Sequence, residues 1–79
     1  MKNLYDIYLT NEKNDAPDLT IGLAMYKAEH PGEITHEGDV AIRQFIGRHG
    51  AVLAKAFKAH DRAMFEAVVD ECIKKDIEG

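Results

Sequence analysis

The sequence predicts an all-α protein, a compact bundle of four or five short helices that forms one domain over residues 1–79. Three observations support this fold class. A chain of 79 residues has room for one modest core. Ten of its residues are alanine, the strongest helix former. The third observation is helical spacing of apolar residues near the C-terminus, at Met64, Phe65, Val68, Val69, Cys72 and Ile73.

The N-terminal segment, residues 3–12, fits either a helix or a strand. Leu4 and Tyr8 stand at helical spacing. Tyr5 and Leu9, on the other hand, belong to an alternating pattern that is typical of a strand. A lone strand would find hardly any partner in the rest of the chain, so we expect a helix here.

The second helix is predicted from Asp18 to about Glu29. Asp18 follows a proline-containing loop, and its carboxylate can accept a hydrogen bond from the first turn. Gly22 inside this helix costs up to about 1 kcal/mol relative to alanine. We therefore expect Gly22 to allow close packing against another backbone. Pro31-Gly32 then ends the helix.

Residues 30–39 form the longest stretch without a regular pattern. Either Thr35 or Asp39 can cap a third helix, which would run to about Arg48. Its buried side would carry apolar residues at helical spacing, namely Ile42, Phe45 and Ile46.

Gly47 and Gly50 flank Arg48-His49 and predict a helix end followed by a turn. A fourth helix would then cover 51–59, with Val52, Leu53, Ala56 and Phe57 as its apolar residues.

Asp61 is a candidate cap for a fifth helix that runs to about Lys75. The alternative is one unbroken helix over 51–75, because aspartate inside a helix is only mildly unfavourable. In that case His60 would join a single apolar stripe from Leu53 to Cys72. The residues do not separate these two alternatives.

The charge pattern is the strongest long-range feature of the chain. The net charge is −4, yet five of the ten Lys and Arg residues lie between positions 40 and 62, beside a single acid. A basic centre thus stands between two acidic ends. We predict that these cations form a partner-binding face: Arg43, Arg48, Lys55, Lys58 and Arg62. The irregular segment 30–38 is an alternative contact surface.

Part of this basic face depends on local helical structure. If residues 51–62 are helical, Lys55, Lys58 and Arg62 fall on one side. A dipolar charge pattern can steer and orient a protein partner. Together with the small size and the lack of a catalytic pattern, this split charge predicts a small non-enzymatic protein-binding module. It would act as a regulator, an inhibitor or a small subunit of a larger assembly. Small inhibitors encoded by phages or mobile elements have the same general character.

Nucleic-acid binding through residues 43–62 is the alternative function. Two short helices around the Gly47–Gly50 turn would resemble a helix-turn-helix arrangement. However, Arg43 stands where a small residue would let the helices approach. The acidic net charge also weakens attraction to phosphates.

The reactive residue types form no catalytic or metal-binding pattern. Cys72 follows two acids, which raise rather than lower a thiol pKa, so we expect it to be a buried structural residue. No zinc-ligand spacing occurs among the four histidines, His30, His36, His49 and His60. We therefore expect no enzyme activity, no metal and no cofactor.

Compartment and partners follow from the same composition. A single cysteine is unusual for a small secreted domain. No signal peptide or apolar run of membrane-spanning length is recognisable. We expect a cytoplasmic protein that binds a larger protein or protein complex rather than a membrane. Self-association is a further way for so small a domain to complete its core.

Overall fold

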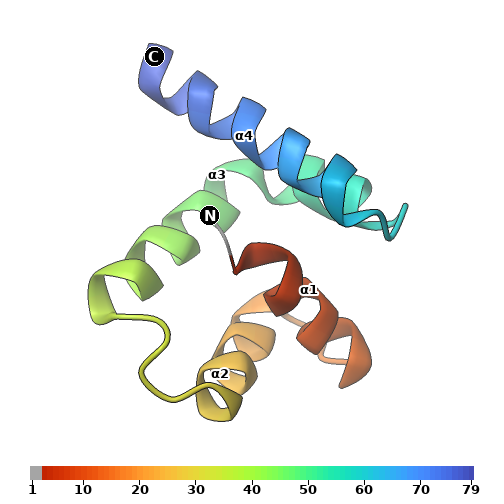
Figure 1. Cartoon of the computed structure of the whole chain (residues 1–79), viewed down its shortest axis with the longest axis vertical. Coiled ribbons are helices and arrows are strands. Elements are labelled where there is room, and N and C mark those ends of the chain that lie inside the picture. Colours follow the sequence, from red (N-terminus) through yellow and green to blue (C-terminus); the bar gives the residue numbers. More distant parts are fainter. Residues whose placement is uncertain (1–2) are drawn as a thin grey trace.

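The computed structural model describes residues 3–79 and confirms the all-α prediction. It contains four helices and no strand within this range (Figure 1). The ambiguous N-terminal segment is a helix, as expected. The elements are α1 (Leu4–Lys13), α2 (Leu19–Glu29), α3 (His36–Phe57) and α4 (Arg62–Glu78).

Three helices begin at the polar residues that the sequence offered as caps. Asp18 accepts a hydrogen bond from the backbone N–H of Thr20 at the start of α2. Thr35, not Asp39, caps α3 through the N–H of Gly38. Asp61 does the same for α4 through the N–H of Met64. Such caps satisfy backbone donors that have no partner within the helix.

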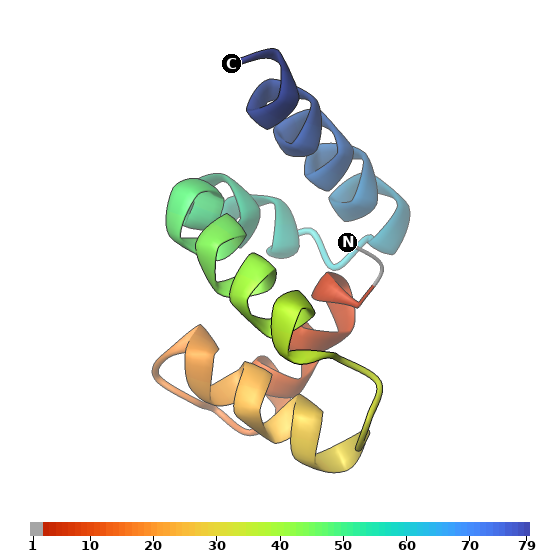
Figure 2. The same ribbon diagram turned by 90° about the vertical axis from the view of Figure 1, so that its left-hand side faces the viewer.

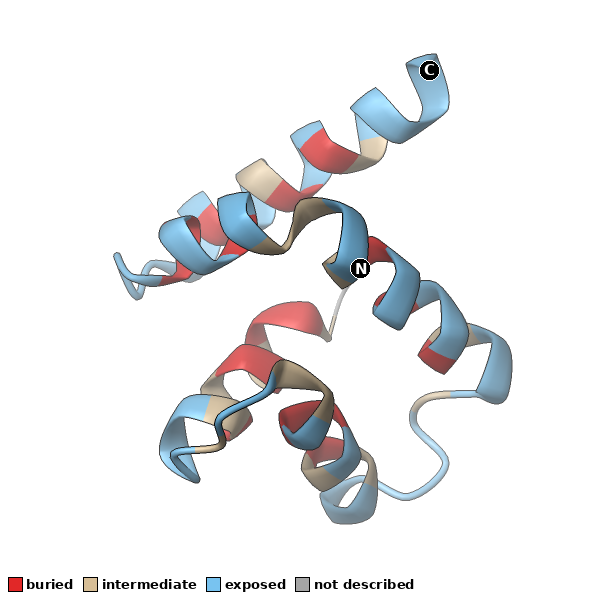
Figure 3. Cartoon of the chain, turned by 180° about the vertical axis from the view of Figure 1, so that it is seen from behind, coloured by how far each residue is buried: buried red, intermediate tan, exposed pale blue. Residues whose placement is uncertain are grey.

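The predicted turn at Gly47–Gly50 is wrong, because α3 continues through both glycines. Neither glycine has the positive φ that a helix-ending glycine usually adopts. The ribbon instead bends near the middle of α3, where these glycines stand (Figures 1 and 3). Glycine pairs are a common cause of such bends. The predicted third and fourth helices are therefore one element, and the loop before it ends at Thr35.

The single helix over 51–75 is also wrong. The chain leaves the helix after Phe57, and His60 adopts a φ of 52° before Asp61 caps α4. A left-handed backbone conformation at a non-glycine residue interrupts a right-handed helix. As a result α4 turns back along the C-terminal half of α3 (Figure 1), and Figure 2 shows the two helices from the side.

Helix α1 is the centre of the packing, since it contacts each of the other three helices. The rings of Tyr5 and Tyr8 lie 5.2–5.4 Å from those of Phe57 and Phe65. These centroid distances are in the favourable range for aromatic pairs. The aromatic cluster of Tyr5, Tyr8, Phe57 and Phe65 thus joins α1, α3 and α4. The buried residues face inward on all four helices (Figure 3).

Gly22 of α2 packs closely against α1. A Cβ atom at this position would stand 2.5 Å from the Cβ of Asn11 on α1. The neighbour is therefore a side chain, not the backbone that we expected. Asn11 is itself held by a hydrogen bond from its Nδ2 to the carbonyl oxygen of Ala16.

Replacing Gly22 with alanine is expected to destabilise the protein by about 1–3 kcal/mol, because the added methyl group overpacks this contact. Gly47→Ala is the matched control. Nothing lies within 4 Å of a Cβ there, so alanine should stabilise α3 by up to about 1 kcal/mol. Urea unfolding of both variants measures the two changes. Shifts of the same sign would contradict this account of Gly22.

Candidate interaction surface

Three of the five predicted binding cations are used in ion pairs within the protein. Arg43 Nε lies 3.0 Å from Asp39 Oδ2, one helical turn earlier. Arg48 Nη2 lies 2.9 Å from Asp76 Oδ2 near the end of α4. These contacts direct the two guanidinium groups toward acids of the same chain.

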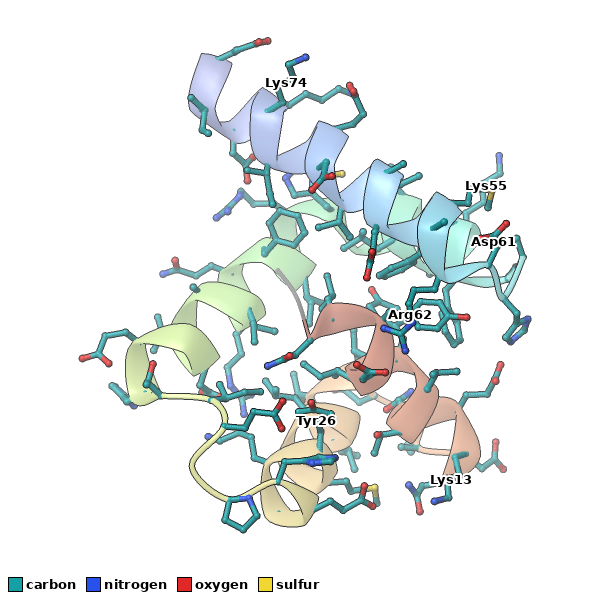
Figure 4. The ribbon with its side chains drawn as sticks, viewed as in Figure 1. Lys13, Tyr26, Lys55, Asp61, Arg62 and Lys74 are labelled. Carbon is teal, nitrogen blue, oxygen red and sulfur yellow. The ribbon has the colours of Figure 1, made fainter. Side chains whose placement is uncertain are left out.

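Arg62 is the third of these cations, and it ties α4 to α1. Its Nη2 atom lies 2.6 Å from Asp6 Oδ1, and its guanidinium carbon lies 4.7 Å from the centre of the Tyr5 ring. The side chain of Arg62 points toward α1, whereas Lys55 lies at the far side of α4 (Figure 4). The turn at residues 58–61 therefore separates Arg62 from the lysines with which a continuous helix would have aligned it.

Asp39 is the most buried charged residue in the described chain, with 8% of its surface exposed. Lys27 of α2 lies 3.3 Å from its Oδ1 atom, whereas Arg43 contacts the other carboxylate oxygen, Oδ2. Burial raises the pKa of the Asp39 carboxyl, but contacts with Arg43 and Lys27 outweigh burial and hold the pKa below its ordinary value. This group joins α2 to the start of α3.

Lys55 and Lys58 are the two predicted cations that form no ion pair with any residue in the range 3–79. Both are exposed: Lys55 lies on the last turn of α3, and Lys58 is the residue that directly follows this helix. Each lysine lies beside an apolar hollow. The five predicted residues are therefore not one face, and the cations that remain free are confined to the C-terminal end of α3.

The first hollow, the α3–α4 groove, has a volume of about 480 Å³. It is lined by Val52, Lys55, Ala56, Met64 and Val68. Val52 is 54% exposed and Met64 is 42% exposed. The sequence placed both residues among the apolar residues of their helices. They are instead open because α1 covers only the inner side of the α3–α4 pair.

The second hollow, the α1–α3 groove, has a volume of about 410 Å³. Its lining includes Tyr8, Leu19, Ile46, Ala54, Phe57 and Lys58. Burial raises the pKa of Tyr8 to about 12, so its hydroxyl stays protonated at neutral pH. The end of α3 thus separates two apolar hollows, and each of them carries one free lysine.

His60 holds the α3–α4 turn against α1. Its Nδ1 atom lies 3.0 Å from the carbonyl oxygen of Lys58, and its Nε2 atom lies 2.8 Å from Glu12 Oε2. Both neighbours are acceptors, so the protonated ring, with two N–H donors, satisfies both. The hydrogen bond with Glu12 is the main reason that the pKa of His60 is raised above its ordinary value of 6.5.

The His60–Glu12 contact predicts a pH dependence. Because the folded pKa of His60 lies above the unfolded value, the contact stabilises the fold below about pH 6.5. That contribution is lost as the pH rises through the folded pKa. NMR titration should find the His60 pKa above 6.5, and Glu12→Gln should lower it. An unchanged His60 titration in Glu12→Gln would refute this assignment, with the other three histidines as internal references.

The other residues considered as a nucleophile or as metal ligands are buried in the core or contact other residues of the chain. Cys72 is buried in the core with 5% exposure, as expected. His49 Nε2 lies 2.9 Å from Asp76 Oδ1, and His30 stacks on Tyr26 with a centroid distance of 4.4 Å. Within residues 3–79, no three His, Cys, Asp or Glu side chains are grouped so that they could hold a metal ion. None of the four helices is long and apolar enough to cross a membrane.

Comparison of the chain with protein-family models, with curated proteins and with solved structures found no match. The proposed function therefore depends on the residues of this chain and their geometry.

Proposed function

We propose that this protein is a small non-enzymatic protein-binding module that acts as a regulator, an inhibitor or a small subunit of a larger assembly. Its docking surface is the C-terminal half of α3 with the two apolar grooves beside it. One observation carries this proposal. The only predicted cations without an internal ion pair in the described chain, Lys55 and Lys58, are those that border the grooves.

Apolar side chains next to a free charge favour a protein partner. Val52 and Met64 leave apolar surface in contact with water, which a partner can cover. Lys55 and Lys58 can then fix the orientation of that partner and speed its association through charge complementarity.

Nucleic-acid binding has weaker support. Since α3 is unbroken, residues 43–59 do not form two short helices around a turn. Three of the five cations are paired with acids, which lowers the positive potential available to phosphates. A binding surface of two lysines and exposed apolar side chains suits a protein better than a phosphate backbone.

Charge reversal tests the proposed function. We expect Lys55→Glu with Lys58→Glu to abolish capture of the partner by the tagged protein from lysate of its native host, after nuclease treatment. Both side chains are exposed, so circular dichroism should find the fold unchanged. The matched control is Lys74→Glu with Lys75→Glu. This control makes the same charge change on α4, at the end far from Lys55 (Figure 4).

Three results would contradict the proposal. The first is equal loss of the partner in both double variants, which would indicate a general charge effect. The second is retention of the partner in the Lys55/Lys58 variant. The third is recovery of nucleic acid with proteins that disappear after nuclease treatment, which would favour the nucleic-acid alternative.

A further inference from the structure

We propose that the α3–α4 groove binds one amphipathic helix of the partner, with apolar residues on its inner side and acidic residues along the edge that faces α3. This inference rests on the proposed function and names the partner chemistry of that same surface.

The groove has the shape and lining that such a helix needs. It lies between α3 and α4, which pack against each other. The small side chain of Ala56 forms part of its lining. Val52 stands on the α3 side, and Met64 and Val68 stand on the α4 side. A helix laid along two paired helices buries apolar residues spaced three or four apart. Methionine adapts well to the side chains of a partner.

The size of the groove favours a single segment over a second copy of this chain. Five residues line it. A stable protein interface usually needs about 20–30 residues on each side. A short helix with two or three apolar anchors matches the available surface, whereas a symmetric dimer would need a much larger apolar face.

Charge sets the direction of the acidic edge. Lys55 lies on the α3 side of the groove without an ion pair among the described residues. On α4, Glu71 follows Met64 and Val68 at helical spacing and is exposed. An acidic residue of the partner is attracted toward Lys55 and repelled from Glu71. The acids of the docked helix therefore face α3.

Site-directed photo-crosslinking tests this inference. Val52→Cys is labelled with a benzophenone maleimide in the full chain, and the native Cys72 is protected from the label by its burial. Ala54→Cys places the same label in the α1–α3 groove as the matched control. Each labelled protein is irradiated in host lysate after nuclease treatment, and the crosslinked peptides are sequenced by mass spectrometry.

We expect the label at position 52 to capture a segment of another protein with apolar residues three or four apart and with Asp or Glu on one edge. Lys55→Glu should lower this crosslink about tenfold, and Lys74→Glu should leave it unchanged. Crosslinks to a second copy, or to a segment without acids, would overturn the inference. Capture only from position 54 would also overturn it, yet would leave the proposed function in place. No capture from either position would refute both proposals.

Discussion

Phe65→Ala is expected to destabilise the protein by about 3–5 kcal/mol. Phe65 is fully buried, with 0% exposure, and its ring contacts Tyr5, Tyr8 and Phe57. Removing it leaves a cavity where α1, α3 and α4 meet. Since small domains are typically stable by only 5–15 kcal/mol, this one change should remove a large share of the total.

Urea unfolding followed by circular dichroism measures this loss as a lower midpoint. Ile77→Ala is the matched control, because Ile77 lies on the same helix and is 81% exposed. We expect the control to change stability by less than about 0.5 kcal/mol. A Phe65→Ala variant that unfolds with the wild-type midpoint would show that the aromatic cluster does not hold the helices together.

Removing both cations from Asp39 is the second large effect. The side chain of Asp39 is only 12% exposed, and in the double variant Lys27→Met with Arg43→Met it loses both partners. Breaking a buried pair in this way costs about 3–5 kcal/mol. We expect the lower end of that range, because the N-terminal end of α3 also favours a negative charge. Methionine preserves most of the packing of the long side chains.

A rescue variant separates charge from packing. Adding Asp39→Asn to the double variant removes the unpaired charge, so we expect it to recover part of the lost stability at pH 7. Urea midpoints of the wild type, the double variant and the triple variant measure this recovery. A triple variant no more stable than the double variant would mean that lost packing, rather than the unpaired carboxylate, causes the destabilisation.

The helix starts could be predicted because their signals are local. Asp18, Thr35 and Asp61 each bind a backbone N–H two or three residues away, so the sequence alone contains both partners. The helix predicted for residues 3–12 was also confirmed, because no other segment forms a strand that could pair with it.

The effect of Gly47 and Gly50 on the helix could not be predicted from the sequence. Gly47 and Gly50 resemble a helix end, yet apolar residues on both sides of them, Phe45 and Leu53, are buried in the same core. Packing of both halves keeps α3 continuous, and the glycines permit a bend instead of a break. Tertiary packing of this kind outweighs a local preference of about 1 kcal/mol per glycine.

The candidate site could be predicted only in part. The sequence identified all five cations, but the acids that pair with Arg48 and Arg62 lie 28 and 56 residues away. Ion pairs over such sequence separations can be identified only from the three-dimensional arrangement of the helices. The exposure of Val52 and Met64 was missed for the same reason. Helical spacing marks an apolar side without saying whether another helix covers it.

The proposed function requires that a protein partner covers the apolar surface beside the C-terminal half of α3. Oxidation of methionine by dilute peroxide, read by mass spectrometry, tests it directly on the captured complex. Met64 lines the α3–α4 groove, and Met25 on α2 is an internal reference away from it. We predict that the partner slows oxidation of Met64 several-fold and leaves Met25 unchanged. Equal oxidation of Met64 with and without the partner would show that the partner does not cover this surface.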